Sequence, residues 1–197
     1  MRYVFLRIIL ERDIQVVSAK GQVVLKNPEV GGREIRLDVL AKDIDGEYIN
    51  IEVQGDSDGA TVRRARYHSS AIDTRILKEG QDFKELKDSY VVFIYAHDKF
   101  GKGLPIYHIE RYVKEIKEPF GDGSHIIYVN GKYTGEDPVG KLVEDFRNKS
   151  AESMNYKELA DSVRHFKETE KGRTMSGGHR LCADRSETEN VMICVRQ

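Results

Sequence analysis

Two acidic side chains and a glutamine are the residues of this chain best placed to do chemistry. Asp38 lies in one alternating apolar segment, and Glu52 and Gln54 lie in a second segment shortly after it. Two carboxylates on adjacent strands repel each other unless a cation or a proton lies between them. Mg²⁺ prefers such oxygen ligands, and a bound Mg²⁺ can polarise a phosphodiester and activate water. The Gln54 amide can donate a hydrogen bond to the phosphate or to the water.

The periodicity of the two segments predicts how these side chains face each other. Residues 35–41 and 49–54 alternate between apolar and polar, which is typical of strands. A three-residue loop at 44–46 with Gly46 in the left-handed conformation keeps apolar residues opposed, whereas a two-residue turn would set them against polar ones. The resulting register pairs Leu37 with Val53, Asp38 with Glu52, Val39 with Ile51 and Ala41 with Ile49, with opposed Cβ atoms about 5 Å apart.

A basic helix is predicted directly after these strands, from about Ala60 to Lys78. Because it begins a few residues beyond Gln54, its first two turns can overhang the carboxylates and contact a phosphate backbone. A solvated helix face is the alternative explanation for the arginines, and half-buried packing is the alternative for the tyrosine. The candidates for nucleic-acid binding are Arg63, Arg64, Arg66 and Tyr67.

Composition limits the function classes. The chain has 197 residues, of which 33% are charged, and no apolar run near the roughly 20 residues needed to span a bilayer. We expect a cytoplasmic protein with no membrane segment. The net charge of −1 gives no global attraction to nucleic acid, so any such binding needs a local patch. The two cysteines, Cys182 and Cys194, build no disulfide framework, and none of the six histidines shows zinc-ligand spacing.

The remaining periodicity predicts one sheet of five or six strands around the long helix. The apolar run Tyr90–Tyr95 is typical of a central strand covered on both faces, and residues 106–113 and 124–129 are further strands. Helical spacing near 139–148 and 155–169 predicts a small helical region. We therefore expect an α/β core over residues 1–135, a helical subdomain over 136–175, and a divergent or disordered tail over 176–197.

These residues resemble the PD-(D/E)XK nuclease superfamily, in particular its recombination-promoting nuclease and transposase branch. The resemblance runs from about Leu6 to Met175. It implies a restriction-endonuclease-like fold, in which helices flank a mixed central sheet. Asp98 belongs to the resemblance, but the sequence explains no chemical role for it. The motifs that carry the resemblance are Asp38, the Glu52-Val53-Gln54 triplet, which takes the E-x-Q form common in that branch, and Arg64-Ala65-Arg66-Tyr67-His68.

The resemblance also implies an activity, which is metal-dependent DNA cleavage in the recombination of mobile elements. Asp38 and Glu52 would hold Mg²⁺, or Mn²⁺ in its place, with help from the carbonyl of Val53. Gln54 would replace the lysine of other members and act with the two acids in catalysis. DNA is the implied partner, and double-strand cleavage would favour a homodimer with two active sites.

The two ends of the chain depart from the family pattern. Family members usually carry a further N-terminal helix with another acidic residue, which Glu11 does not match, so we expect a truncated N-terminus. The tail from about Ser176 does not resemble the acidic, helix-prone ending of the family. One alternative is therefore an inactive remnant that keeps the fold and binds nucleic acid. Another is a retaining glycosidase, which also uses two carboxylates about 5 Å apart, although this chain has no tryptophan for a sugar platform.

Overall fold

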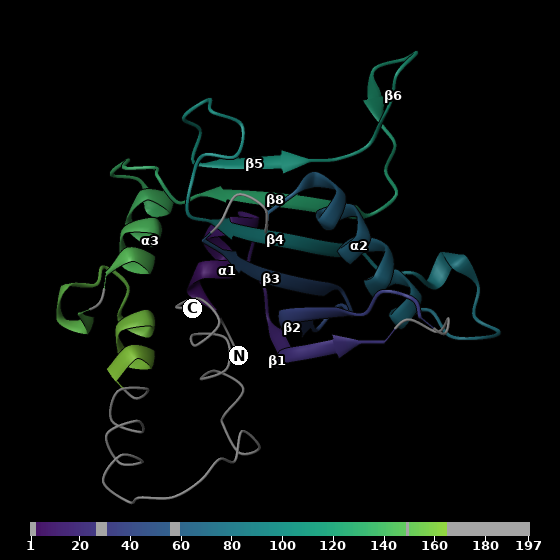
Figure 1. Ribbon diagram of the computed structural model, residues 1–197, viewed down its shortest axis with the longest axis horizontal. Helices are drawn as coiled ribbons and strands as arrows, with labels where there is room; N and C mark the ends of the chain where they lie inside the picture. The colour runs from purple at the N-terminus through teal and green to yellow at the C-terminus, as the bar shows by residue number, and fades with distance from the viewer. Residues whose placement is uncertain (1–2, 27–30, 56–59, 149, 165–197) are drawn as a thin grey trace, which may run out of the picture.

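Six strands form one mixed sheet in the part of the chain that the computed structural model describes, residues 3–26, 31–55, 60–148 and 150–164 (Figure 1). The strand order is β1-β2-β3-β4-β8-β5. β3, β4 and β8 run parallel, and the other three run antiparallel to their neighbours. The strands are β1 (Val16–Leu25), β2 (Ile35–Asp43), β3 (Tyr48–Gln54), β4 (Ser89–Tyr95), β5 (Ile106–Ile109) and β8 (Ser124–Asn130).

The β2–β3 hairpin has the predicted register in the half that is nearer its loop. Val39 pairs with Ile51, and the ladder continues to the Lys42–Tyr48 pair. Gly46 has a φ of 89°, so it supplies the left-handed residue that the predicted loop needs. The ladder ends at Val39, and this corrects the prediction that Asp38–Glu52 and Leu37–Val53 are further backbone pairs.

The central strand is β4, as the apolar run Tyr90–Tyr95 predicts. It lies between β3 and β8, and every residue in it except Tyr90 is buried. Helices cover both of its faces, which explains why β4 carries apolar residues at consecutive positions rather than at alternate ones.

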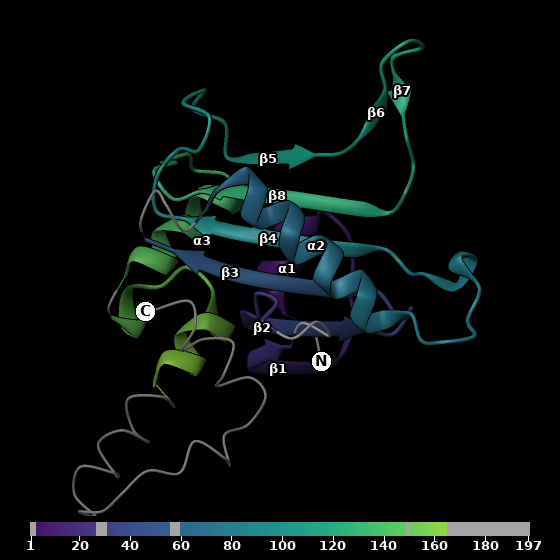
Figure 2. The same ribbon diagram turned by 45° about the vertical axis from the view of Figure 1, so that its right-hand side comes forward.

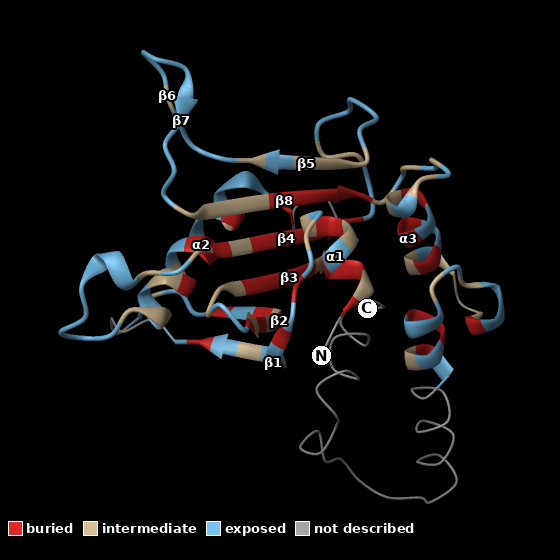
Figure 3. Cartoon of the chain, turned by 180° about the vertical axis from the view of Figure 1, so that it is seen from behind, coloured by how far each residue is buried: buried red, intermediate tan, exposed pale blue. Residues whose placement is uncertain are grey.

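One long helix covers one face of the sheet, a short helix covers the other, and a third helix packs beside the short one (Figure 1). α2 (Val62–Ile76) lies across β3, β4 and β8 (Figure 2). α1 (Val4–Leu10) lies across the opposite face, where Figure 3 shows it in front of the sheet. α3 (Pro138–Arg147) packs against α1 through an edge contact between Phe5 and Phe146, with ring centroids 6.4 Å apart. The architecture is the restriction-endonuclease-like α/β class that the sequence predicts.

The strand predicted for residues 106–113 is two separate strands, which corrects that prediction. β5 ends at Ile109, and β6 (Tyr112–Val113) pairs with β7 (Glu118–Pro119) in a small hairpin that projects beyond the sheet (Figure 1). The two residues between β5 and β6 bind side chains instead of continuing the ladder: Glu110 contacts His125 and Arg111 pairs with Asp122.

The chain becomes helical after residue 135, as predicted. α3 is followed by a helix that begins at residue 157, and Leu159 and Val163 of that helix join the core beside α1. The predicted 136–175 subdomain extends past the described residues, the 176–197 tail lies outside them, and the division into domains stays a prediction. Within the described ranges, no helix has the length and apolar character needed to cross a membrane.

Candidate active site

The two carboxylates of the predicted site bind the open ends of β2 and β3 to each other. The Asp38 backbone N–H donates to Glu52 Oε1 at 3.2 Å. The Val53 N–H donates to Asp38 Oδ2 at 3.0 Å. Each carboxylate thus takes the place of a backbone carbonyl on the opposite strand, which explains why the ladder stops at Val39. The structure therefore brings Asp38 and Glu52 together at the carboxyl end of β3.

Glu52 is the more unusual of the two acids, because its side chain is fully buried. Burial raises the pKa of Glu52 from 4.5 to about 7, and the nearby Asp38 carboxylate raises it as well. The Asp38 N–H, the Arg64 charge and a hydrogen bond from Asn50 act in the opposite direction and lower this pKa. A carboxylate in this state changes its charge near neutral pH, which is a common property of functional acids.

Arg64 and His68 reach Glu52 from α2, one helical turn apart. Arg64 Nη2 lies 3.3 Å from Glu52 Oε2, and Arg64 Nε donates to His68 Nε2 at 3.3 Å. His68 Nδ1 lies 3.6 Å from Glu52 Oε1, so both residues of α2 contact the same carboxylate. Burial, together with the Arg64 charge, lowers the pKa of His68 to about 4, so the ring is neutral at pH 7.

Sequence reasoning missed His68 and Asn50 as parts of this site. Asn50 precedes Glu52 by two residues and is fully buried, and its side-chain amide lies 3.1 Å from His68 Nδ1. The signal for His68 was its spacing of four from Arg64, on the helix face that also buries Ala65. A buried histidine and a buried asparagine in the middle of an apolar face mark a polar cluster.

The four residues predicted to bind nucleic acid do not form one group. Arg63 and Arg66 are exposed on the first turns of α2, as a phosphate contact requires. Arg64 instead faces Glu52, and Tyr67 donates from its hydroxyl to the Arg33 carbonyl at 2.6 Å. Phosphate binding by Arg63 and Arg66 stays a prediction.

Gln54 lies half-buried at the end of β3. It is two residues beyond Glu52, so strand alternation places both side chains on the same face. Its backbone carbonyl accepts a hydrogen bond from the Ala96 N–H at 3.0 Å, which joins the end of β3 to the loop after β4. Among the described residues, no hydrogen bond involves its side-chain amide, so the amide can bind another group.

A family comparison covers this whole site. A model of the family described as PD-(D/E)XK nuclease family transposase matches residues 3–134. The chain belongs to this family. Asp38, Glu52 and Gln54 all lie within the matched residues, and α3 lies beyond them. No curated protein and no solved structure matches the chain.

The side chains of this PD-(D/E)XK family member fit a hard divalent cation. PD-(D/E)XK nucleases generally use divalent metals. A cation would offset the repulsion between Asp38 and Glu52, and the buried Asn50 Oδ1 has no hydrogen-bond partner among the described residues, so a water bound to the ion can satisfy it. The described residues hold no group of three or more His, Cys, Asp or Glu side chains suited to a metal. The ligands would therefore be two carboxylates, the Val53 carbonyl and water, a set typical of Mg²⁺.

Proposed function

We propose that this protein is a Mg²⁺-dependent DNA endonuclease that hydrolyses phosphodiester bonds during transposition or recombination. Membership in a nuclease family supports a nuclease-like role with DNA as the substrate. The single observation that carries the proposal is the Asp38–Glu52 pair, which interlocks two strands and leaves Glu52 buried with a pKa near 7. A buried acid with a raised pKa costs folding free energy, and such acids are found most often at functional sites.

The roles of the residues follow from their positions. Asp38, Glu52 and the Val53 carbonyl would hold Mg²⁺, or Mn²⁺ in its place. When bound, the ion supplies Lewis-acid polarisation of the phosphate and an acidified water. Gln54, on the same face and beyond Glu52, orients the attacking water or the phosphate through its amide. Arg64 and His68 fix the Glu52 carboxylate from the helix side.

Replacing Asp38 tests the proposal. We expect Asp38→Ala to abolish Mg²⁺-dependent cleavage of plasmid DNA, because one ligand of the ion is lost, while the far-UV circular dichroism spectrum stays unchanged. The matched control is Asp45→Ala, which removes an exposed acid from the loop of the same hairpin and should leave cleavage intact. Cleavage that survives in Asp38→Ala would contradict the assignment.

The main alternative is an inactive remnant that keeps the fold and binds nucleic acid. Calorimetric titration with Mn²⁺ separates the two, since the remnant should show no binding that depends on Glu52, whereas the nuclease should lose binding in Glu52→Gln. The family match gives no support to a glycosidase. The homodimer and the cytoplasmic location stay predictions.

A further inference from the structure

The loop at residues 96–105, here called the Asp98 loop, is fixed by one carboxylate. Asp98 Oδ1 accepts hydrogen bonds from the N–H groups of Phe100 at 3.2 Å and Gly101 at 3.0 Å, and from the Tyr107 hydroxyl at 2.6 Å. Asp98 Oδ2 accepts from the Gly103 N–H at 2.7 Å. The Tyr107 hydroxyl holds the pKa of Asp98 below its usual range, and the loop N–H groups add to this effect. These contacts give Asp98 a role that the sequence alone does not explain.

An ammonium group is held on this loop by aromatic rings. Lys99 Nζ lies 5.7 Å from the centroid of Tyr95 and 5.9 Å from that of Tyr128. Phe100 packs edge-on against Tyr128 at 5.7 Å, which ties the loop to the sheet. Aromatic faces attract a cation without neutralising it, so Lys99 keeps its charge available for a further partner.

Strand register places this lysine beside the candidate active site. Glu52 pairs with Phe93 on β4, and Phe93 pairs with Tyr128 on β8, so the three side chains lie on one face of the sheet. Two strand spacings separate Glu52 from Tyr128, which is about 10 Å. Lys99, which lies over Tyr128, is therefore on the same face of the sheet as Glu52, two strands away.

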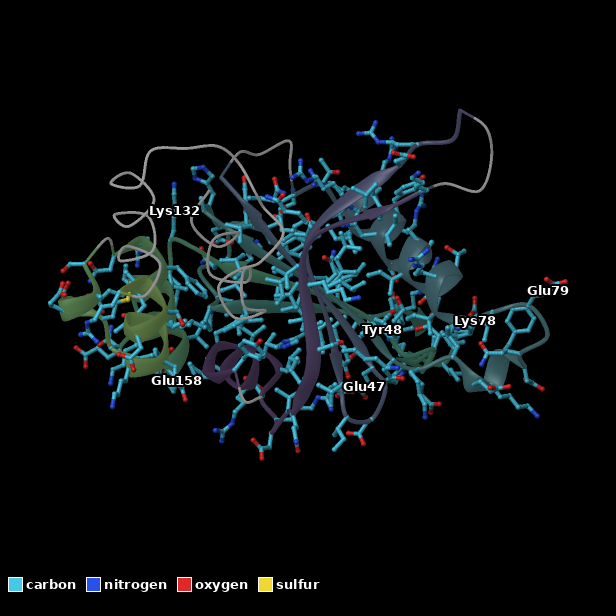
Figure 4. The ribbon with its side chains drawn as sticks, turned by 90° about the horizontal axis from the view of Figure 1, so that it is seen from below. Glu47, Tyr48, Lys78, Glu79, Lys132 and Glu158 are labelled. Carbon is cyan, nitrogen blue, oxygen red and sulfur yellow. The ribbon has the colours of Figure 1, made fainter. Side chains whose placement is uncertain are left out.

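Two further lysines lie at the same end of the sheet. Lys102 is exposed on the Asp98 loop, and Lys132 is exposed directly after β8. Figure 4 shows Lys132 at the opposite end of the molecule from Lys78. In the described part of the chain, none of Lys99, Lys102 and Lys132 forms an ion pair with a carboxylate.

We propose that the Asp98 loop and Lys132 form a surface that binds the phosphate backbone of DNA next to the cleaved bond. This inference rests on the proposed function and adds the residues that hold the substrate. Phosphate contacts fix the position of a nucleic acid, and cations that are already ordered lose less entropy on binding. With a net charge of −1, the protein needs such a local surface.

Charge removal tests the surface. The triple variant Lys99→Gln/Lys102→Gln/Lys132→Gln should bind a fluorescent DNA duplex more weakly in EDTA, measured by anisotropy. The slope of log K against log salt should become shallower by about three, at about 0.9 per lost phosphate contact. The control Lys78→Gln/Lys114→Gln/Lys117→Gln removes the same charge from exposed positions on α2's carboxyl end and the β6–β7 hairpin, and it should keep the wild-type slope. Equal slopes for the two triple variants would overturn the inference.

Replacing Asp98 distinguishes an ordered loop from simple charge attraction. Asp98→Ala removes a negative charge, so net charge alone predicts tighter DNA binding. The proposed surface predicts weaker binding, because the loop loses the acceptor of four hydrogen bonds. Tyr107→Phe, which removes one of the four, should have a smaller effect in the same direction. Tighter or unchanged binding by Asp98→Ala, with an unchanged far-UV spectrum, would contradict the proposal.

The two proposals fail in different ways. Wild-type protein that binds DNA with a steeper salt slope than the lysine triple variant, but does not cleave it, would contradict the nuclease and leave the lysine surface standing. Wild-type protein that cleaves DNA while the lysine triple variant binds as tightly as the control would contradict only the surface. Wild-type protein that binds no DNA in EDTA would overturn the surface whatever its cleavage activity.

Discussion

The β2–β3 hairpin carries a buried carboxylate near each end, and the fold supports the two differently. Asp43, at the loop end beside Glu47 (labelled in Figure 4), is 2% exposed. Asp43 Oδ1 accepts a hydrogen bond from the Glu47 N–H at 2.8 Å, and Asp43 Oδ2 lies 3.8 Å from Arg12 Nη2. Each buried acid has a second acid beside it, Glu47 for Asp43 and Asp38 for Glu52, but Arg12 pairs with both acids at the loop end, whereas Arg64 pairs with Glu52 at the open end.

The difference separates an acid that stabilises its own turn from one that is the better candidate for a function. The partners of Asp43 come from its own turn and from an arginine, which matches the expectation that loop acids stabilise turns. Glu52 has the charge of Arg64, but burial and Asp38 outweigh it and raise the pKa of Glu52 to about 7. A buried acid that its surroundings leave short of positive charge is the better candidate for binding a cation.

The largest expected effect is on the free energy of unfolding. Neutralising the acid at one end of the hairpin should raise it, and neutralising the acid at the other end should lower it. At pH 8 the ionised Glu52 carries the cost of a pKa raised from 4.5 to about 7, or about 3 kcal/mol of folding free energy. Glu52→Gln should therefore stabilise the protein by up to about 3 kcal/mol. Asp43→Asn should destabilise it by about 1 to 3 kcal/mol, since it weakens charged hydrogen bonds. Urea unfolding at pH 8 measures both, and destabilisation by both variants would contradict the comparison.

The next effect is a pH dependence of folding stability. It is small in the wild-type protein because two contributions nearly cancel. The folded-state pKa of Glu52 is raised to about 7, so its stabilising contribution is complete below pH 4.5 and is lost as the pH rises through 7. The folded-state pKa of His68 is lowered to about 4, so its contribution is complete above pH 6.5 and is lost as the pH falls through 4. Between pH 4.5 and 6.5 the two contributions change in opposite directions and nearly cancel.

A variant that removes one of the two groups should show the pH dependence that the other group contributes. Glu52→Gln, which keeps His68, should lose about 3 kcal/mol of its own stability as the pH falls from 6.5 to 4. His68→Gln should gain about the same amount as the pH falls from 7 to 4.5. Urea unfolding across this range provides the measurement. Parallel pH profiles for the two variants would show that the two groups do not titrate as described.

The strands of the site could be predicted from the sequence. Alternation in β2 and β3, together with Gly46, predicted the Val39–Ile51 register, and the unbroken apolar run of β4 predicted a central strand. These features depend on local periodicity and on one backbone conformation, which a single sequence records directly.

The side-chain cluster around Glu52 could be predicted only in part. Which side chains of α2 meet Glu52 depends on how the helix is rotated over the sheet, and His68 and Ser69 interrupt the apolar pattern that would indicate the rotation. The sequence could not predict that the ladder ends at Val39, because this end follows from carboxylates that replace backbone acceptors. Strand period does not record such a replacement.

The smallest predicted effect concerns Arg64, which the sequence groups with Arg66 as a DNA contact. Burial is the larger cause of the low pKa of His68, and the Arg64 charge is the second. Arg64→Gln should therefore raise the pKa of His68 while leaving it below 6.5, because burial remains. Titration of the histidine ring protons by NMR measures this pKa, with His68→Gln identifying the resonance.

Arg66→Gln is the matched control, because it removes the same charge two residues away from an exposed position. The pKa of His68 should not change in this variant, whereas the salt slope of DNA binding should fall by about one if Arg66 contacts a phosphate. An equal rise of the His68 pKa in both variants would mean that the overall field of α2 acts on the ring. The Arg64–His68 contact would then not be what distinguishes this end of the hairpin from the Asp43 end.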